Sequence, residues 1–550
     1  MKISIFFKIT ALSIIGSLFF STINAQSLES KIDNILSNQF KSNETGVSAL
    51  VAKDGKVIYR KAFGKANLEL DVDMTSENVF EVGSITKQFT SVAILMLLEE
   101  GKLSLEDDIT KYVPDYPTDG NKITIHNLLT HTSGIKNYTS MPSFGKVMTI
   151  DESPLKFINF FKNEPLDFKP GEKYAYSNSG YFLLGYIIEK ASGMSYSKFI
   201  KERIFDKIGM SSSYYGSHSK LIKNRASGYQ KRGEYSNAVY ISLTLPYAAG
   251  SIMSTVDDML KWQTAITTDV FVKEATIDKA FTNYTLNNGD KINYGYGWSL
   301  DELNGVSTIE HGGAIPGYLS MGVFVPSKNV YVIVFSNCGC QSPTNTALKI
   351  AALAIDKPMF KLDSKIKLSK EQLNKWVGAY QFDNDVVRFI TLKEGQLYSK
   401  REGSPKSFKI HPTSSNTFSF EDGLISYKFS IKDGKKVALF KNRINKAKGV
   451  FVDKKAPKEK KEIKISADIL KTYDGVYELQ PGFDLTIESK GNQLFAQATG
   501  QPQFELFAES EMKFFLKVVK ASVEFHKNDK GEIEALTLFQ GGRAMKAKKK

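Results

Sequence analysis

The stretch Glu81-Val-Gly-Ser-Ile-Thr-Lys-Gln-Phe-Thr90 places Ser84 three residues before Lys87. Residues three apart on a helix lie on one face, so a helix that begins near Ser84 points the Lys87 amine at the Ser84 hydroxyl. A serine hydroxyl needs such a base to act as a nucleophile, and the free N–H groups at a helix start suit an oxyanion beside it. Apolar residues from Phe89 to Leu97 would anchor this helix. The stretch therefore predicts a nucleophilic serine at the start of a buried helix.

The Ser-x-x-Lys spacing is not specific by itself. It recurs at Ser133/Lys136, Ser195/Lys198 and Ser510/Lys513, and an isolated pair of this kind is usually structural. The chain has no His-Glu-x-x-His, Walker loop, Gly-x-Gly-x-x-Gly or zinc spacing, so we expect no metal and no cofactor. It also lacks the Gly-x-Ser-x-Gly elbow of common esterases. The assignment of Ser84 therefore depends on downstream segments.

The N-terminus has the pattern of a secretory signal peptide. Lysines precede an apolar run that ends at Phe20, and Ile23-Asn24-Ala25 resembles a cleavage site. A membrane anchor is the alternative, but the run is short for a span. We expect residues 1–25 to be removed, leaving a periplasmic or secreted protein without a membrane span.

The composition indicates a globular protein of several domains, with 550 residues of which 42% are hydrophobic. Its net charge of +14 falls mainly on residues 361–550, which contain 37 Lys and Arg against 24 Asp and Glu. Part of this excess comes from the segments 454–461 and 546–550, for which a solvated linker and tail are the favoured interpretation, and contact with anionic polymers of the cell envelope is the alternative. Aromatic residues do not interleave with the charges, so we expect no nucleic-acid partner. The only cysteines, Cys338 and Cys340, are one residue apart, too close for an ordinary disulfide framework.

Residues 26–360 alternate between helix and strand patterns. Asp54-Gly55 joins two strand patterns and predicts a hairpin. We expect helices over 28–40, from Ser84 onward, and over 181–191, 256–262 and 347–355, and strands over 47–53, 56–63, 294–298, 308–313, 318–325 and 330–335. Tyr176-Ser-Asn178 lies in the loop before one of these helices, where functional residues are common. His131 could be catalytic, but a histidine buried for structural reasons is the favoured interpretation.

An internal repeat follows residue 365. Trp376–Tyr380 corresponds to Tyr473–Tyr477 at an offset of 97 residues, and Gln396-Leu-Tyr398 corresponds to Gln493-Leu-Phe495. Each copy is alternating and rich in turns, which predicts two small antiparallel barrels over residues 365–453 and 465–550. The lysine-rich segment 453–464 would separate them as a linker.

Three ordered segments resemble the serine β-lactamase and penicillin-recognising family, in the branch of class C β-lactamases, esterases and D-aminopeptidases. Gly83–Lys87 resembles the first motif, Tyr176-Ser-Asn178 the second and His311-Gly-Gly313 the third. Leu128-Leu-Thr-His-Thr-Ser-Gly134 is also typical of this family. The resemblance implies an α/β (α+β) fold with an antiparallel sheet, flanking helices and a helical lobe. The two C-terminal repeats are similar to the lipocalin-like modules of some members.

The resemblance also implies roles for single residues. Ser84 would be the acylated nucleophile, Lys87 would keep the proton network in place, and Tyr176 would be the general base and acid. That role requires a lowered phenol pKa, which a close Lys⁺ can provide. Substrate binding would fall to Asn178, His311, Gly312, Gly313 and Ala314, the last by its backbone N–H together with that of Ser84 as oxyanion hole.

His311 departs from the family pattern, because many β-lactamases and transpeptidases have Lys there. A neutral imidazole does not hold a substrate carboxylate as a fixed cation does. We therefore expect an exported serine hydrolase that acts through an acyl-enzyme on small amides or esters, with D-amino-acid peptides among the candidates. The alternatives are a β-lactamase or D-Ala-D-Ala carboxypeptidase and, in a different class, a non-catalytic penicillin-binding or sensor protein.

Overall fold

The computed structural model describes residues 26–359, 365–383, 385–456 and 462–550. The signal peptide predicted for residues 1–25 lies outside this part of the chain. Within the described ranges, no helix is long and apolar enough to cross a membrane.

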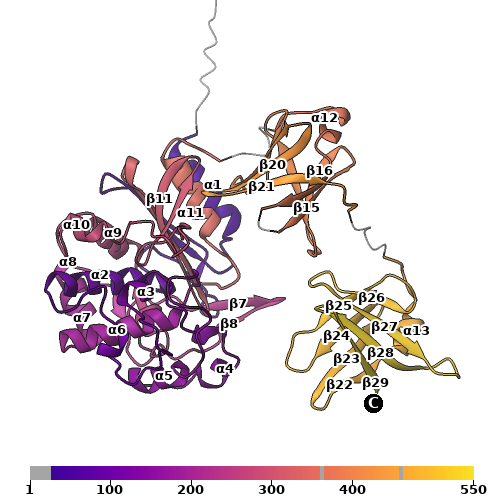
Figure 1. The fold of residues 1–550 in the computed structure, drawn as a ribbon, viewed down its shortest axis with the longest axis horizontal. Helices are drawn as coiled ribbons and strands as arrows, with labels where there is room; N and C mark the ends of the chain where they lie inside the picture. Colours follow the sequence, from indigo (N-terminus) through magenta and orange to yellow (C-terminus); the bar gives the residue numbers. More distant parts are fainter. Residues whose placement is uncertain (1–25, 360–364, 384, 457–461) are drawn as a thin grey trace, which may run out of the picture.

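A six-stranded antiparallel sheet forms the centre of the N-terminal domain, in the order β10-β11-β12-β13-β1-β2 (Figure 1). The strands are β1 (Val47–Lys53), β2 (Lys56–Phe63), β10 (Ser299–Leu303), β11 (Val306–Ile315), β12 (Tyr318–Val325) and β13 (Val330–Ser336). The predicted hairpins 47–63 and 318–335 are both present, because Asp54-Gly55 and Asn329 adopt the positive φ that tight turns need. The predicted α/β fold with an antiparallel sheet is confirmed.

Both faces of this sheet are buried, as the alternation along β13 shows. Val330, Val332 and Val334 pack with α1 (Leu28–Gln39) and α11 (Thr344–Ala354). Their neighbours Tyr331, Ile333 and Phe335 belong to the larger core on the opposite face. Full burial of one such side chain stabilises the fold by about 1.5–3 kcal/mol. Because many are buried on both faces, the sheet is a rigid support for the residues at its edge.

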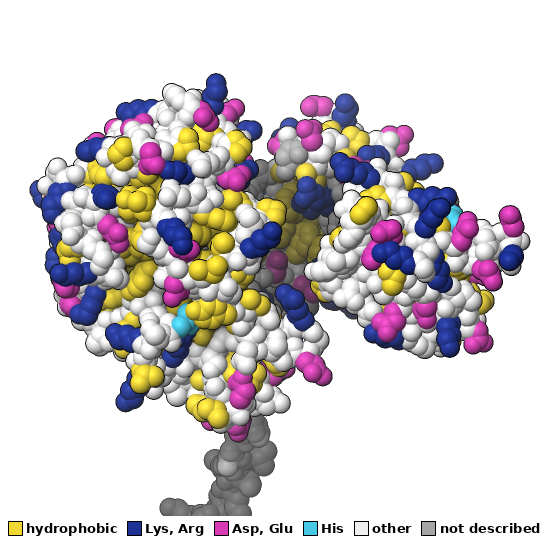
Figure 2. All heavy atoms as spheres, turned by 90° about the horizontal axis from the view of Figure 1, so that it is seen from below, with side chains coloured by type: hydrophobic (Ala, Val, Ile, Leu, Met, Phe, Trp, Pro, Cys, Tyr) yellow, Lys and Arg dark blue, Asp and Glu magenta, His cyan; other side chains and the backbone are white. Residues whose placement is uncertain are grey.

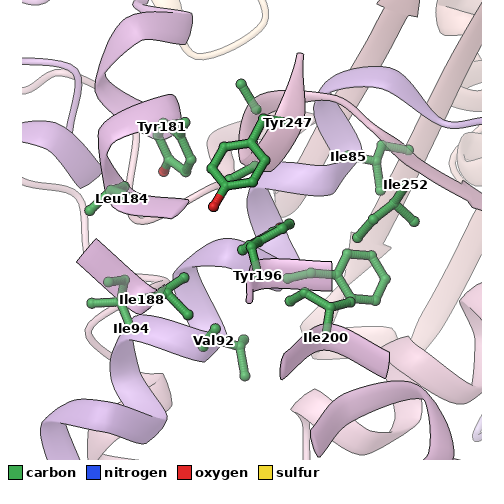
Figure 3. Packing of buried hydrophobic residues seen from close by; sticks show 14 of the residues in the cluster. Ile85, Val92, Ile94, Tyr181, Leu184, Ile188, Tyr196, Ile200, Tyr247 and Ile252 are labelled. Carbon is green, nitrogen blue, oxygen red and sulfur yellow. The ribbon is translucent and has the colours of Figure 1, made fainter. Parts of the chain in front are cut away.

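The larger core joins the sheet to a helical lobe built around α2 (Thr86–Glu99) and α6 (Asn178–Ser192). Helix α6 begins where the Ser177 side chain accepts a hydrogen bond from the Gly180 N–H, and it ends at Gly193 with φ +73°. Figure 3 shows side chains of the two helices and their surroundings interlocking, among them Val92, Ile94, Tyr181, Leu184, Ile188, Tyr196 and Tyr247. The other helices are α3 (Ile125–Leu129), α4 (Phe144–Val147), α5 (Pro154–Phe161), α7 (Tyr196–Ile200), α8 (Asp206–Ile208), α9 (Val256–Ile266) and α10 (Glu274–Ile277).

Two sequence expectations are wrong. Residues 294–298 form no strand, because Gly297 has φ +83° and its backbone packs so closely on α2 that an added Cβ would lie 2.8 Å from the Lys87 carbonyl oxygen. Cys338 and Cys340, expected to be too close for an ordinary disulfide, are joined in one at the end of β13. Their backbone positions, 5.1 Å apart at Cα, fall within the usual range for a disulfide.

The C-terminal part contains two closed eight-stranded antiparallel barrels, as the repeat predicted. The first comprises α12 (Lys370–Asn374), β14 (Gly378–Phe382), β15 (Val387–Lys393), β16 (Gln396–Arg401), β17 (Ser407–Pro412), β18 (Thr417–Ser419), β19 (Ile425–Lys432), β20 (Lys435–Asn442) and β21 (Asn445–Val452). The second comprises α13 (Ala467–Thr472), β22 (Gly475–Gln480), β23 (Phe483–Lys490), β24 (Gln493–Ala498), β25 (Phe504–Ala508), β26 (Lys513–Phe515), β27 (Ala521–Lys527), β28 (Ile533–Gln540) and β29 (Arg543–Lys549).

The barrels differ in their attachment to the N-terminal domain. In Figure 1 the first barrel lies against this domain near β11 and α11, whereas the second stands apart. Among described residues, no hydrogen bond or ion pair joins the second barrel to the N-terminal domain. Figure 2 shows Lys and Arg side chains interspersed with Asp and Glu over the face seen from below.

Candidate active site

Ser84 lies where the sheet meets the helical lobe. It belongs to a 3₁₀ turn (Gly83–Ile85) that runs directly into α2, as the motif predicted. Gly83 has φ +54°, and a Cβ there would lie 2.8 Å from the backbone nitrogen of Ala314. Gly313 is equally constrained, since its Cβ would lie 2.0 Å from the Val82 carbonyl oxygen. These two glycines let the backbone of β11 pack directly beside Ser84.

Lys87 is completely buried, and its amine contacts three oxygen atoms. The Nζ atom lies 3.1 Å from Ser84 Oγ and donates to Asn178 Oδ1 and to the Ala249 carbonyl, both at 2.8 Å. Because the latter two oxygens can only accept, they fix two N–H bonds and leave the third position of the amine directed at Ser84. Burial lowers the pKa of Lys87 well below its ordinary value, which favours the neutral amine. A neutral Lys87 presents its lone pair to the Ser84 hydroxyl.

Tyr176 lies next to this pair, at the end of the loop that precedes α6. The Lys87 Nζ is 4.8 Å from the centre of its ring. The Tyr176 hydroxyl is buried and makes no hydrogen bond of standard geometry within the described part of the chain. Burial raises its pKa well above the ordinary value, and the nearby Ser84 hydroxyl offsets only part of this rise. The expected lowering of the phenol pKa by Lys87 is therefore wrong, and Tyr176 is a protonated phenol.

Asn178 is the first residue of α6 and connects Lys87 to the lobe. Its Oδ1 accepts the Lys87 hydrogen bond, while its backbone N–H donates to Asn137 Oδ1 at 3.1 Å. Asn178, which the sequence analysis predicted as a substrate-binding residue, thus holds Lys87 in the free site, and its contact with substrate stays a prediction. Asn137 and the Ala249 carbonyl are partners that the sequence reasoning missed, since nothing in their local sequence marks them.

His311 lies in β11 with only 5% of its surface exposed. Its Nδ1 is 2.6 Å from the Gly312 carbonyl, which can only accept, so the proton is on Nδ1. Its Nε2, 2.9 Å from the Tyr294 hydroxyl, is then the acceptor. Burial, the largest cause, lowers the pKa of His311 to about 4. His311 is therefore neutral, as expected, and both of its ring nitrogens have partners within the protein, so its contact with substrate stays a prediction.

The segment from His311 to Ala314 forms an open strand edge. Strand β10 pairs with β11 only from Val306 to Glu310, whereas β12 pairs with β11 up to Ile315. Beyond Glu310, no described strand pairs with β11 on the side opposite β12. Gly312 and Gly313 leave the edge without side chains, and Ala314 is exposed. An extended substrate backbone can pair here as an additional strand.

His131 lies beneath the site. Its ring centre is 4.2 Å from that of Tyr176, and its Nδ1 accepts from the Ser177 N–H at 3.1 Å. Only 1% of the residue is exposed, and burial lowers its pKa well below the ordinary value. This agrees with the structural interpretation of His131, because it supports the loop that carries Tyr176 and is separated from solvent.

Comparisons with known proteins agree with this fold. Residues 32–355 match the β-lactamase family, and residues 459–549, the second barrel, match a domain family of unknown function named DUF3471. The chain is 30% identical to penicillin-binding protein 4* of Bacillus subtilis over 401 residues, 68% of this chain and 87% of that protein.

Solved structures show the same similarity. The octameric penicillin-binding protein homologue from Pyrococcus abyssi is 28% identical, with a TM-score of 0.54, over 77% of this chain and 99% of that one. D-amino acid amidase from Ochrobactrum anthropi shares the fold, with a TM-score of 0.53 at 24% identity over 60% of this chain and 98% of that one. With the family match covering more than half of its length, and Ser84, Lys87 and Tyr176 gathered in one site, the chain belongs to the β-lactamase family, whose members include serine hydrolases.

Proposed function

We propose that the protein is a serine hydrolase that forms an acyl-enzyme on Ser84. The observation that carries this proposal is the amine of Lys87, which is buried, held by two carbonyl oxygens and 3.1 Å from Ser84 Oγ. A serine used only for structure has no need of a desolvated lysine fixed in this way. A non-catalytic penicillin-binding or sensor protein would likewise have no need of a buried lysine amine beside the serine, so this arrangement favours an enzyme.

The proton route follows from the charge states of the free site. Neutral Lys87 takes the Ser84 proton while Oγ forms a bond to the substrate carbonyl carbon, and the resulting oxyanion accepts hydrogen bonds from the backbone N–H groups of Ser84 and Ala314. As the bond to the leaving group breaks, the Tyr176 phenol gives it a proton and is reprotonated from Lys87. Water then attacks the acyl-enzyme by the reverse route and releases Ser84.

The open edge of β11 and the neutral side chain of His311 indicate the class of substrate. The open edge accepts an extended backbone, and neutral His311 supplies no cation for a carboxylate. We therefore propose small amides or esters without a free carboxylate at this position. D-amino-acid amides are the first to test, because an amidase of this specificity shares the fold. Penicillins and D-Ala-D-Ala peptides, which carry that carboxylate, are the second candidates.

We also propose that the protein acts outside the cytoplasm. The apolar N-terminal run with its cleavage-site pattern supports export. The disulfide between Cys338 and Cys340 is an independent indication, because disulfides persist mainly in oxidising compartments. We propose contact with anionic envelope polymers through the basic C-terminal part of the chain, in which residues 365–453 contain 18 Lys and Arg against 9 Asp and Glu.

The test is covalent labelling of the full chain with a serine-directed fluorophosphonate, followed by peptide mass spectrometry. We expect the added mass on the peptide that carries Ser84, and none in Ser84→Ala. Ser510→Ala is the matched control, because Ser510 has the same spacing to a lysine but lies in a partly exposed turn between β25 and β26. Labelling that persists in Ser84→Ala would refute the assignment.

A substrate panel then separates the classes of hydrolase. It consists of D- and L-amino-acid amides, a neutral nitrophenyl ester, a D-Ala-D-Ala peptide and a chromogenic cephalosporin. We expect kcat/KM for the neutral amide or ester to exceed that for the cephalosporin. The opposite order would identify a β-lactamase and overturn the interpretation of His311.

A further inference from the structure

The hairpin between β20 and β21 of the first barrel reaches the edge of the N-terminal sheet. At its tip, Arg443 donates to both carboxylate oxygens of Glu310 in β11, at 2.5 and 2.7 Å. The same guanidinium donates to the Glu302 carbonyl at 3.0 Å and to Thr308 Oγ1 at 3.1 Å. Asp301 lies 3.1 Å away and also accepts from the Ile444 N–H. One barrel residue thus contacts both strands of the β10–β11 hairpin.

This contact is buried. The side chains of Arg443 and Glu310 are only 10% and 7% exposed. A two-pronged guanidinium–carboxylate pair fixes direction as well as distance, and removing one member leaves the other as an uncompensated buried charge. A surface ion pair, in contrast, has little effect on geometry.

Arg443 occupies the first position of a two-residue hairpin turn, where the turn needs a positive φ. Its φ is +57°, in the left-handed region that non-glycine residues avoid. At the corresponding β28–β29 turn of the second barrel, Gly541 adopts φ +59°. A barrel of this type can therefore make the turn with glycine, whereas the first barrel has at this position a side chain that reaches Glu310.

Glu310 lies at the junction between the supported and the open parts of β11. It pairs with Ser299, the first residue of β10, and His311 follows it directly on the open edge. A second contact from the same tip, Asn293 Nδ2 to Asn445 Oδ1 at 3.4 Å, lies one residue from Tyr294, the partner of His311. The barrel therefore contacts both neighbours of the His311–Tyr294 pair.

We infer that Arg443 is a positioning residue supplied by the first barrel, which holds Glu310 and thereby sets the open edge of β11, from His311 to Ala314, against Ser84. The inference deepens the proposed function, because it assumes that this edge binds substrate and completes the oxyanion hole. Arg443 touches no reacting atom and acts through β11 alone.

The test compares three full-length variants. Arg443→Gly removes the guanidinium and gives the turn its preferred residue, so a role limited to turn formation predicts a fold at least as stable and an unchanged site. Arg443→Lys keeps the charge but not the fork. Lys441→Ala, at the same tip, removes a half-exposed ion pair with Glu302 and is the matched control.

The readouts are the rate constant of Ser84 labelling, kcat for a neutral ester and amide hydrogen exchange of β11. For Arg443→Gly we expect labelling and kcat to fall about tenfold to hundredfold, as small displacements in an active site do. Exchange should quicken at His311–Ala314, while Arg443→Lys is intermediate and Lys441→Ala stays within about twofold of the wild type. A wild-type labelling rate and unchanged β11 exchange in Arg443→Gly would overturn the inference.

The hydrogen-exchange readout keeps this inference distinct from the proposed function. If the wild-type chain never labels at Ser84, the proposed function fails, yet exchange of β11 still shows whether Arg443 holds the strand. If Arg443→Gly does not fold, the comparison rests on Arg443→Lys against Lys441→Ala. Equal β11 exchange in those two variants would then overturn the inference.

Discussion

The two barrels are copies of one fold with different relations to the rest of the molecule. In the first, the Tyr380 hydroxyl donates to the Trp376 carbonyl at 2.8 Å, and in the second Tyr477 donates to the Tyr473 carbonyl at 2.7 Å. Their surfaces differ, because residues 365–453 contain 18 basic and 9 acidic residues whereas residues 465–550 contain 12 of each. The β20–β21 turn of the first barrel carries Arg443 and contacts the N-terminal sheet, whereas the corresponding β28–β29 turn of the second barrel carries Gly541.

The two barrels share the residues that form the barrel fold and differ in the residues that contact the N-terminal domain. The repeated tyrosines and the strand alternation lie inside and are kept in both copies. The contact with Glu310 depends on Arg443, an outer position where the sister barrel has Gly541. Leu424 adds to the same interface by packing against the core between the sheet and α11. The first barrel is therefore joined to the N-terminal domain by specific contacts, whereas among the described residues no hydrogen bond or ion pair joins the second barrel to that domain.

The largest expected effect comes from removing the Tyr176 hydroxyl in the site, with removal of a tyrosine hydroxyl in the second barrel as the control. Tyr176→Phe should lower kcat by about 10²–10⁴, the usual size of a general acid–base contribution, without unfolding the protein. Tyr477→Phe removes a buried hydroxyl of the second barrel and should leave kcat unchanged. Steady-state kinetics on both variants, with circular dichroism as the folding control, makes the comparison. Normal turnover in a folded Tyr176→Phe protein would exclude its role as proton donor.

Acid pH should distinguish the N-terminal domain, through His311 in β11, from the second barrel. The folded-state pKa of His311, about 4, lies below its ordinary value of 6.5, so the folded protein keeps the ring neutral where the unfolded chain binds a proton. Acidification from pH 6.5 to 4 should therefore cost the N-terminal domain about 3 kcal/mol of stability through this residue, and stability above pH 6.5 should not depend on it.

The measurement is chemical denaturation of the wild type and His311→Asn at pH 7.5, 5.5 and 4.5. The variant should lose less stability on acidification. Buried His131 contributes in the same direction in both proteins, so the difference between them reports on His311. Equal pH dependence would mean that His311 titrates normally in the folded protein.

Two truncations should separate the barrels. A chain ending at residue 456 keeps Arg443 and should label at Ser84 within about twofold of the full-length rate. A chain ending at residue 359 leaves Glu310 without Arg443, and labelling should slow about tenfold to hundredfold because the β11 edge is displaced. Labelling kinetics and thermal unfolding of both chains measure this. Equal rates would show that the first barrel is as dispensable as the second.

The smallest expected effect comes from placing an arginine in the sister turn. Gly541→Arg forces a non-glycine residue into a left-handed conformation and should destabilise the second barrel by about 1–2 kcal/mol. Among the described residues, no Asp or Glu side chain is hydrogen bonded to this turn as Glu310 is to Arg443. No compensating contact should therefore form, and kcat should not change. Denaturation followed by a probe in the second barrel tests this. An undiminished stability would imply that the φ of Arg443 carries no cost either.

Much of the fold could be predicted from local patterns. The β1–β2 hairpin follows from Asp54-Gly55 between alternating segments, and both barrels follow from the repeat at offset 97. The grouping of Ser84, Lys87 and Tyr176 followed from the resemblance of three ordered motifs to the β-lactamase family. The hairpin and the barrels depend on periodicity or spacing, which a single sequence displays.

The parts that could not be predicted depend on tertiary contacts. The irregular backbone around Gly297 exists because it packs on the Lys87 carbonyl, and His311 is engaged because Tyr294 reaches it from another segment. Burial, which raises the Tyr176 pKa and lowers that of Lys87, is a property of the assembled core. Arg443 is one of many basic residues in its barrel, and only its conformation and partners distinguish it.

The bridge between Cys338 and Cys340 has a consequence for the protein under mechanical load. It closes a loop of so few residues that it links no distant parts of the chain. A force applied to the two ends would meet no covalent crosslink within either barrel, and each could be drawn out to a contour length on the order of 300 Å. Resistance to extension would come from strand pairing and from the packed core of each barrel, and the first barrel, anchored through Arg443, would transmit that force directly to β11.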